Sequence, residues 1–301
     1  MVRICGGMVL YEPEINLLKE NISCIIDQLD VLYIFDNGSN NSDLIKKEVV
    51  NVYPKINYYF SKKNLGIAYG LNWLLKKSME DNFDWCLTLD QDSICSSNMI
   101  SEYKKYITYP KIALISPFVL NNSKFTLEEY KKLSLPDYEY ITEPMNCITS
   151  GCLTNVKIFN NLHGVNSKLF IDFVDTELNC KVLDNGYRIL RANRTYLIQQ
   201  MGKAHQVKLF DWLYRKTKLN TFRRMKVATV YTDQRLYYSS RNSRYIRKNF
   251  NHVGKRTSFI FMSMYYCYFS LFYPKNRSRK AMWNSIIKGF KDYKYISGDQ
   301  S

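Results

Sequence analysis

Short apolar runs alternate with stretches of helical periodicity along the first 120 residues. Runs of this kind favour buried strands, and the amphipathic stretches between them favour helices that cover a sheet. We expect strands at about Arg3–Leu10, Val31–Phe35, Ile56–Phe60, Trp85–Leu89 and Ile112–Ser116. We expect the intervening helices at about Glu14–Gln28, Ser42–Val50, Ile67–Glu80 and Asn98–Tyr106. The alternation predicts an α/β fold with a mainly parallel central sheet flanked by helices.

The rest of the chain changes character twice. Residues 121–149 are polar and interrupted by prolines, which predicts loops and an edge hairpin. Helical periodicity returns at Val156–Leu162 and Asp172–Leu183, followed by short apolar runs at Arg188–Leu190 and Tyr196–Ile198 that favour strands. The tail has helical patterns at Tyr231–Phe250, Thr257–Pro274 and Ala281–Tyr295. We therefore expect a domain at 1–210 and a basic, aromatic-rich helical region at 211–301.

The formal charge of +16 lies in this tail, because residues 201–301 hold 22 Lys and Arg against 4 Asp and Glu. Such asymmetry favours an anionic partner, either nucleic acid or anionic lipid. The run Thr257–Pro274 is uncharged but rich in Tyr and Ser, which favours a helix at a membrane surface over one that spans it. Alternatively, the tail helices simply cover the sheet.

The compartment is predicted from the cysteines and the first residues. Eight cysteines occur without any C-x-x-C pair, and Met1–Leu10 lacks the pattern of a secretory signal. We expect a reducing, cytoplasmic setting and no zinc site.

Two Gly-containing motifs follow predicted strands. In F-D-N-G-S-N-N (35–41), Asp36 ends a strand, and the ligand crevice of an open α/β sheet lies at such carboxyl ends. In N-L-G-I-A-Y-G (64–70), Asn64 and Gly66 precede a helix whose unpaired N–H groups favour anions. Each motif is also an ordinary turn or helix start when taken alone.

Carboxylates are concentrated at two further places. The strand L-T-L ends in Asp90, Gln91 and Asp92, and paired hard oxygen ligands suit Mg²⁺ or Mn²⁺ carrying a diphosphate. In F-I-D-F-V-D-T-E (170–177), Asp172 and Asp175 share a helix face, and burial among apolar neighbours would raise a carboxyl pKa toward that of a general base.

Taken in order, these motifs resemble the family 2 inverting glycosyltransferases of the GT-A fold over about residues 2–210. The motifs that carry the resemblance are Y-E-P (11–13), D-N-G-S (36–39), N-L-G (64–66), D-Q-D-S (90–93), S-G (150–151) and D-x-x-D-x-E (172–177). The D-Q-D-S form with F-I-D-x-V-D and a following His is similar to bacterial rhamnosyltransferases of O-antigen and capsule assembly. Departures are Glu12 in place of Asn, Val174 in place of Glu, and His163–Asn166 in place of G-G-F-D.

The resemblance implies a role for each motif residue. Asp175 would be the base, with Asp172 the next candidate, and Asp90, Asp92 and His205 would hold Mg²⁺ or Mn²⁺. The nucleotide sugar would be bound by Tyr11, Asp36, Asn64, Gly66, Asp90, Gln91, Ser150 and Gly151.

The resemblance also implies a reaction, the transfer of L-rhamnose from dTDP-rhamnose. The basic tail predicts a location, peripheral on the inner face of the bacterial cell membrane, and the acceptor would then be a lipid-linked saccharide. Two alternatives stay open: the donor is a UDP-hexose or another nucleotide sugar, and the enzyme forms a homodimer. Rival hypotheses are a nucleic-acid-binding protein that uses the Tyr-rich basic stretch 208–250, and a catalytically silent scaffold. Nucleic-acid binding would leave the acidic strand-end motifs without a role.

Overall fold

The computed structural model describes residues 2–121, 126–199, 204–229, 231–272 and 277–296. The chain divides into two compact units. The first comprises Met1–Val119, Ser134–Ile198 and Phe250–Val253, and the second comprises Leu120–Leu133, Gln199–Asn249 and Gly254–Ser301. The second unit therefore combines most of the basic last third of the chain with the segment 120–133.

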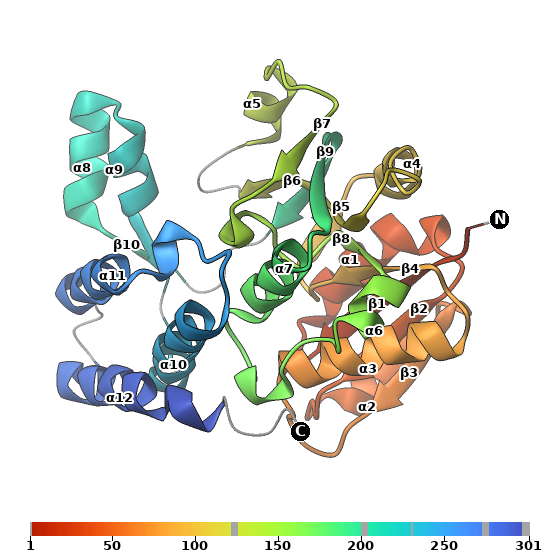
Figure 1. Cartoon of the computed structure of the whole chain (residues 1–301), viewed down its shortest axis with the longest axis horizontal. Helices are drawn as coiled ribbons and strands as arrows, with labels where there is room; N and C mark the ends of the chain where they lie inside the picture. Colours follow the sequence, from red (N-terminus) through yellow and green to blue (C-terminus); the bar gives the residue numbers. More distant parts are fainter. Residues whose placement is uncertain (1, 122–125, 200–203, 230, 273–276, 297–301) are drawn as a thin grey trace. The chain divides into compact units, whose positions relative to one another are not determined.

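Within the described residues, the first unit is built on a nine-stranded sheet in the order β3-β2-β1-β4-β8-β6-β9-β5, with β7 paired to β9 (Figure 1). Its strands are β1 (Ile4–Leu10), β2 (Leu32–Asp36), β3 (Ile56–Phe60), β4 (Trp85–Leu89), β5 (Ser93–Cys95), β6 (Ile112–Asn121), β7 (Tyr138–Ile141), β8 (Cys152–Asn155) and β9 (Arg188–Gln199). The predicted α/β class is confirmed. Strands β3, β2, β1 and β4 are parallel, whereas β8 runs antiparallel to both β4 and β6, so the sheet is mixed rather than mainly parallel.

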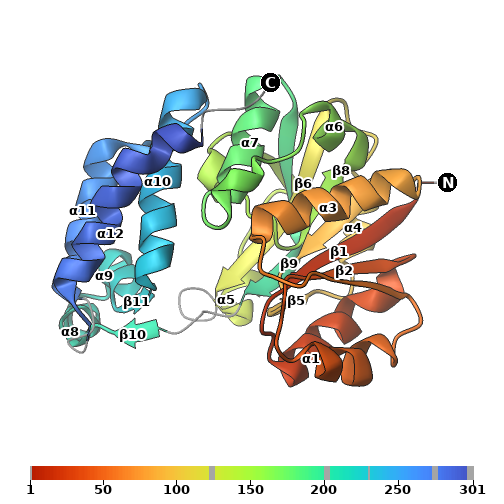
Figure 2. The ribbon, with the colours of Figure 1, turned by 90° about the horizontal axis from the view of Figure 1, so that it is seen from below.

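Helices lie on both faces of this sheet. They are α1 (Ile15–Ile25), α2 (Ser42–Ile45, extended by a wider turn Lys46–Val50), α3 (Ile67–Glu80), α4 (Met99–Lys104), α6 (Val156–Asn161) and α7 (Val174–Asp184), with single 3₁₀ turns at Ile26–Gln28, Pro144–Asn146 and Ser167–Leu169. Figure 2 shows α3 and α6 on one face and α1 on the other. Burial of the apolar side chains between these layers drives the fold, and the core on the α1 side includes Met8, Leu18, Ile22 and Ile34.

Several sequence expectations are wrong in detail, and each error has the same physical cause. The two runs after residue 187 form one continuous strand, β9, and the predicted edge hairpin is instead the strand β7 paired with β9, preceded by α5 (Leu127–Lys131). Part of the predicted hairpin, residues 122–125, lies outside the described residues. Pairing between segments some fifty residues apart leaves no local periodic signal.

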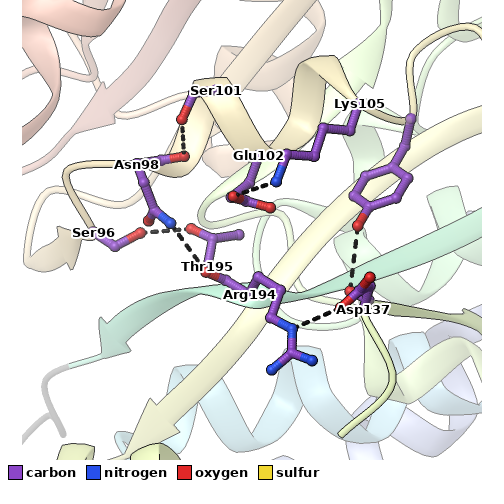
Figure 3. Close-up of polar contacts among 9 residues, drawn as sticks. Ser96, Asn98, Ser101, Glu102, Lys105, Asp137, Arg194 and Thr195 are labelled. Carbon is purple, nitrogen blue, oxygen red and sulfur yellow. Dashed lines mark hydrogen bonds and ion pairs between the residues drawn. The ribbon is translucent and has the colours of Figure 1, made fainter.

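Polar contacts fix the segment that follows β4. Figure 3 shows Ser96 bonded to Thr195 (2.5 Å between hydroxyl oxygens) and the Asn98 amide donating to the Arg194 carbonyl at 3.0 Å. The Arg194 guanidinium in turn pairs with Asp137 at 2.7 Å. The contacts of Ser96 and Asn98 tie the chain between β5 and α4 to β9, just beyond the residues that follow β4.

The second unit is mainly helical. It contains α5, α8 (Lys208–Thr217), α9 (Asn220–Met225), α10 (Asp233–Asn249), α11 (Phe259–Phe272) and α12 (Arg279–Asp292), with 3₁₀ turns at Lys255–Thr257 and Tyr293–Tyr295 and a β-ribbon of β10 (Ala204–Gln206) and β11 (Val227–Thr229). Helices α10 and α12 approach closely at Gly289, where a Cβ would lie 2.3 Å from the Tyr237 carbonyl oxygen. None of the helices described here has both the length and the apolar character needed to cross a bilayer.

Candidate active site

The loops that follow β1, β2 and β4 are joined by hydrogen bonds at the carboxyl edge of the sheet. The Gln91 side-chain amide accepts from the Tyr11 N–H at 2.9 Å and donates to the Tyr11 carbonyl at 3.2 Å. The Glu12 N–H donates to the Ser39 hydroxyl at 2.9 Å, and the Glu12 carboxylate accepts from Asn40 at 2.7 Å. The three loops, which are distant in sequence, therefore form one connected surface at the carboxyl ends of their strands. This is the place where an open α/β sheet binds its ligand.

Asp36 is fully buried at the end of β2. Its carboxylate accepts from the Ser39 N–H at 2.9 Å and from the Tyr58 hydroxyl at 2.5 Å. Burial and this hydrogen bond to Asp36 raise the pKa of Tyr58, so Tyr58 stays a neutral donor. Gly38 turns the loop with φ +86°, where a Cβ would lie 2.8 Å from the Lys63 carbonyl carbon. Tyr58 was missed by sequence analysis, and its only signal is its place on the neighbouring strand.

Asn64 shapes the loop before α3. Its side-chain oxygen accepts from the Asn37 amide and from the Gly66 N–H, both at 2.9 Å. Asn37 also accepts from the Leu65 N–H at 2.7 Å. The D-N-G-S and N-L-G motifs are therefore locked to each other.

The expectation of unpaired N–H groups at the start of α3 needs correction. The Phe170 carbonyl oxygen accepts from the Ile67 N–H at 2.7 Å and from the Ala68 N–H at 3.4 Å. Because these donors already have a partner, they are not open to an anion. Because Gly66 has no side chain, Phe170 can lie directly against its backbone.

Asp90 and Asp92 follow β4, as predicted. The Asp90 N–H donates to the buried Ser150 hydroxyl at 3.0 Å, and the Asp90 carbonyl accepts from the Asn21 amide at 2.6 Å. Ser150 donates onward to the Ser93 hydroxyl at 3.1 Å. Burial raises the pKa of the partly buried Asp92 carboxyl, and the neighbouring Asp90 is not among the causes.

A carboxylate whose charge is made costly by burial favours a cation beside it. Mg²⁺ is typically held by one or two carboxylates together with substrate phosphates, so Asp90 and Asp92 fit an ion that arrives with a diphosphate. No group of three His, Cys, Asp or Glu that could hold a metal occurs within the described part of the chain. His205 lies exposed on β10 in the second unit, and its role as a ligand stays a prediction.

Gly151 joins β8 to its neighbours. Its N–H donates to the Thr88 carbonyl of β4 at 2.8 Å, and its carbonyl accepts from the buried Tyr103 hydroxyl at 2.6 Å. The structure therefore gives both residues of the S-G motif a part in holding the end of β4, and their contact with a nucleotide sugar stays a prediction.

The loop before α7 presents the acidic motif in an unusual backbone conformation. Phe170, Asp172 and Phe173 have φ of +66°, +63° and +62°. Left-handed backbone at non-glycine residues persists only where surrounding contacts enforce it, and such strain clusters at functional sites. Helix α7 begins at Val174, so Asp172 lies in this loop and not on a helix face shared with Asp175.

Asp175 lies in the first turn of α7. Burial raises its pKa to about 6, and the charge of Asp172 adds to the rise, while the Thr176 N–H at 2.8 Å opposes it. The charge of Asp175 also raises the pKa of the Cys147 thiol, after the hydrogen bond to Cys152 and burial. A carboxyl of this kind suits proton abstraction near neutral pH.

Glu177, the last residue of the acidic motif, has a structural role that sequence analysis did not assign. It is fully buried, accepts from the Asn166 N–H at 2.8 Å and pairs with Lys181 at 3.2 Å. Lys181 also donates to the Gly164 carbonyl at 2.8 Å. These contacts attach the loop 164–166 to α7.

Comparison with known proteins agrees with this geometry. The family model described as Glycosyl transferase family 2 matches residues 9–160, which is half of the chain. The dTDP-rhamnosyl transferase RfbF of Shigella flexneri is 24% identical over 192 residues, covering 61% of this chain and 64% of RfbF. The match therefore spans less than two thirds of that relative.

Solved structures share the fold at low sequence identity. S. aureus TarS 1-349 in complex with UDP-GlcNAc has a TM-score of 0.59 and 11% identity, covering 98% of this chain and 81% of TarS. The mannosyltransferase PcManGT of Pyrobaculum calidifontis, in complex with GDP-Man and Mn²⁺, has a TM-score of 0.56 and 12% identity, covering 99% and 76%. GalNAc-T7 with UDP, GalNAc and Mn²⁺ has a TM-score of 0.56 and 10% identity, covering 98% and 56%.

Proposed function

The chain belongs to glycosyl transferase family 2, and on that premise we propose that it is a metal-dependent inverting enzyme. It transfers L-rhamnose from dTDP-rhamnose to a lipid-linked saccharide during cell-surface polysaccharide synthesis, as in O-antigen or capsule assembly. The observation that carries the proposal is the pair of acidic centres: Asp175 in the first turn of α7, with a pKa of about 6, and the partly buried Asp92 in the loop that follows β4. The similarity to RfbF supports rhamnose as the sugar.

The chemistry is a single displacement at the anomeric carbon. Asp175 accepts the proton of the acceptor hydroxyl while that oxygen forms a bond to the anomeric carbon, and the bond from that carbon to the diphosphate oxygen breaks. The anomeric configuration inverts because attack and departure occur on opposite faces. A divalent ion at Asp90 and Asp92 would neutralise the charge on the departing diphosphate. Asp36 is fully buried and already accepts from Tyr58 and Ser39, so it would fix the shape of the D-N-G-S loop beside the nucleotide.

A panel of nucleotide sugars tests the donor. Purified protein with Mn²⁺ is mixed with dTDP-rhamnose, UDP-GlcNAc, UDP-glucose or GDP-mannose, and thermal protection and slow donor hydrolysis are measured. We expect dTDP-rhamnose to give the largest effect in both measurements. Preference for a UDP-hexose would be consistent with the family but would contradict rhamnose as the transferred sugar. Salt-sensitive RNA binding without hydrolysis of any donor would instead favour nucleic-acid binding.

The second unit supplies a candidate surface for the lipid-linked acceptor. Helix α11 carries no charged residue, and its Met262, Tyr266 and Phe269 are buried within the unit. On the opposite side, Ile260, Met264 and Leu271 are each about 70% exposed, at 73%, 68% and 70%. Exposed Arg256 precedes the helix, and exposed Arg279 and Lys280 follow it. An open apolar stripe with basic residues at both ends suits an anionic lipid surface, and we propose that α11 lies on the cytoplasmic face of the membrane.

Vesicle binding tests this surface. Replacing both Ile260 and Leu271 by Asp should weaken binding to phosphatidylglycerol-containing vesicles by about tenfold or more. The change removes apolar area that would enter the lipid on binding, and it adds negative charge that anionic lipid repels. Cosedimentation measures the bound fraction. The control replaces the exposed Leu44 and Val52 of the first unit by Asp and should leave binding unchanged. Equal binding by both variants would refute the surface, and loss of a dimer in the α11 variant would assign it to a second copy.

A further inference from the structure

The start of α3 and the loop before α7 are packed more tightly than either motif predicts. A Cβ on Gly66 would lie 2.6 Å from the Phe170 ring and 2.7 Å from both its Cα and its carbonyl oxygen. Real side chains do not reach such distances, so only glycine fits here. The same Phe170 carbonyl oxygen accepts the Ile67 N–H at 2.7 Å. The contact therefore combines a steric requirement with a helix-capping hydrogen bond.

A second residue of α3 holds the same loop further upstream. The Asn72 amide donates to the Val165 carbonyl at 2.6 Å and to the Ser167 hydroxyl at 3.0 Å. Its oxygen accepts from the Val165 N–H at 2.9 Å. One turn and a half of α3 thus fixes the chain from 165 to 170, immediately before the left-handed residues Asp172 and Phe173.

We propose that Gly66 and Asn72 are positioning residues for the acidic loop, and that Gly66 does not bind the nucleotide sugar. The start of α3 holds Phe170, and Phe170 holds the strained turn that sets Asp172 against Asp175. This rests on the proposed role of Asp175 as the base. It assigns Gly66 of the N-L-G motif to the acceptor side of the reaction, whereas the sequence pattern had suggested the donor side.

The variant Gly66→Ala tests the proposal through two separate measurements. Displacing Phe170 should lower kcat by about 10- to 100-fold, because a misplaced base loses near-attack geometry. Titration with dTDP in the presence of Mn²⁺ should give an unchanged Kd. The pH dependence of kcat/KM should also move, because the distance from Asp172 to Asp175 and the burial of Asp175 both change.

Gly186→Ala is the matched control. Gly186 also has a positive φ, +72°, but no atom lies within 4 Å of the position of its Cβ. The substitution therefore places a side chain at a positive φ without a clash, and kcat should stay at the level of the unmodified protein. Asn72→Ala provides a second test if Gly66→Ala does not fold, and it should lower kcat with the dTDP affinity intact.

Two results would overturn the inference. One is a weaker dTDP affinity in Gly66→Ala with kcat preserved, which would return Gly66 to the donor site. The other is an unchanged kcat and pH profile in both folded variants. Absence of turnover in the unmodified protein with every donor would count against the proposed function itself, and the two failures are thereby distinguished.

Discussion

Replacing Asp175 by Asn should lower kcat by about 10²- to 10⁴-fold, the range that a positioned general base contributes. The amide cannot take the acceptor proton, yet its oxygen can still accept the Thr176 N–H that now bonds to Asp175 at 2.8 Å. The fold and donor binding should therefore survive. Initial rates with donor and acceptor, together with dTDP titration, measure the two effects.

The pH profile gives an independent signature of this base. Because burial, with a contribution from Asp172, raises the pKa of Asp175 to about 6, the carboxylate form predominates only above that pH. The value of kcat/KM should rise with pH through about 6 and then level off. Removing the neighbouring charge with Asp172→Asn should move the midpoint to lower pH. A large rate loss in Asp172→Asn with full activity in Asp175→Asn would instead identify Asp172 as the base.

Replacing Asp92 by Asn should lower kcat by about 10²- to 10³-fold, as expected for loss of a preorganised electrostatic group. Burial already makes the charge of Asp92 costly, so a cation beside it gains more than it would at an exposed carboxylate. The amide keeps the size of the side chain and removes the negative charge. Rates measured over a range of Mn²⁺ concentrations should show a weaker dependence on the metal.

Asp43→Asn is the control for charge alone, because Asp43 is exposed and its surface ion pair with Lys46 is long, at 3.6 Å. It should leave the rate and its metal dependence unchanged. Full activity in Asp92→Asn would remove the metal from the proposed chemistry. Absence of turnover in the unmodified protein with every donor would instead favour a catalytically silent role.

The local pattern of apolar and polar residues was sufficient to predict the strands and helices whose buried side chains recur at regular spacing. Strands β3 and β4 and helix α3 have the predicted bounds, because apolar alternation and helical spacing act within each segment. The continuous strand β9 and the short strands β5 and β8 were not predicted, since their pairing depends on partners distant in sequence.

The residues of the candidate site also fall into those that local sequence predicts and those that depend on contacts between distant segments. Asp36, Asp90 and Asp175 could be selected because carboxylates at strand ends and helix starts follow from local sequence. Tyr58 could not, because its hydrogen bond to Asp36 depends on the register of β2 with β3. The contact of Gly66 with Phe170 joins residues about a hundred positions apart, so the sequence showed a glycine without its partner.

Calorimetric titration of dTDP into the protein, with Mn²⁺ and with chelator, tests the central claim most directly. That claim is that Asp90 and Asp92 bind a divalent ion together with a diphosphate. The account predicts at least about tenfold tighter binding with Mn²⁺, and loss of that gain in Asp92→Asn. Equal affinity with chelator, or a gain that persists in Asp92→Asn, would contradict it.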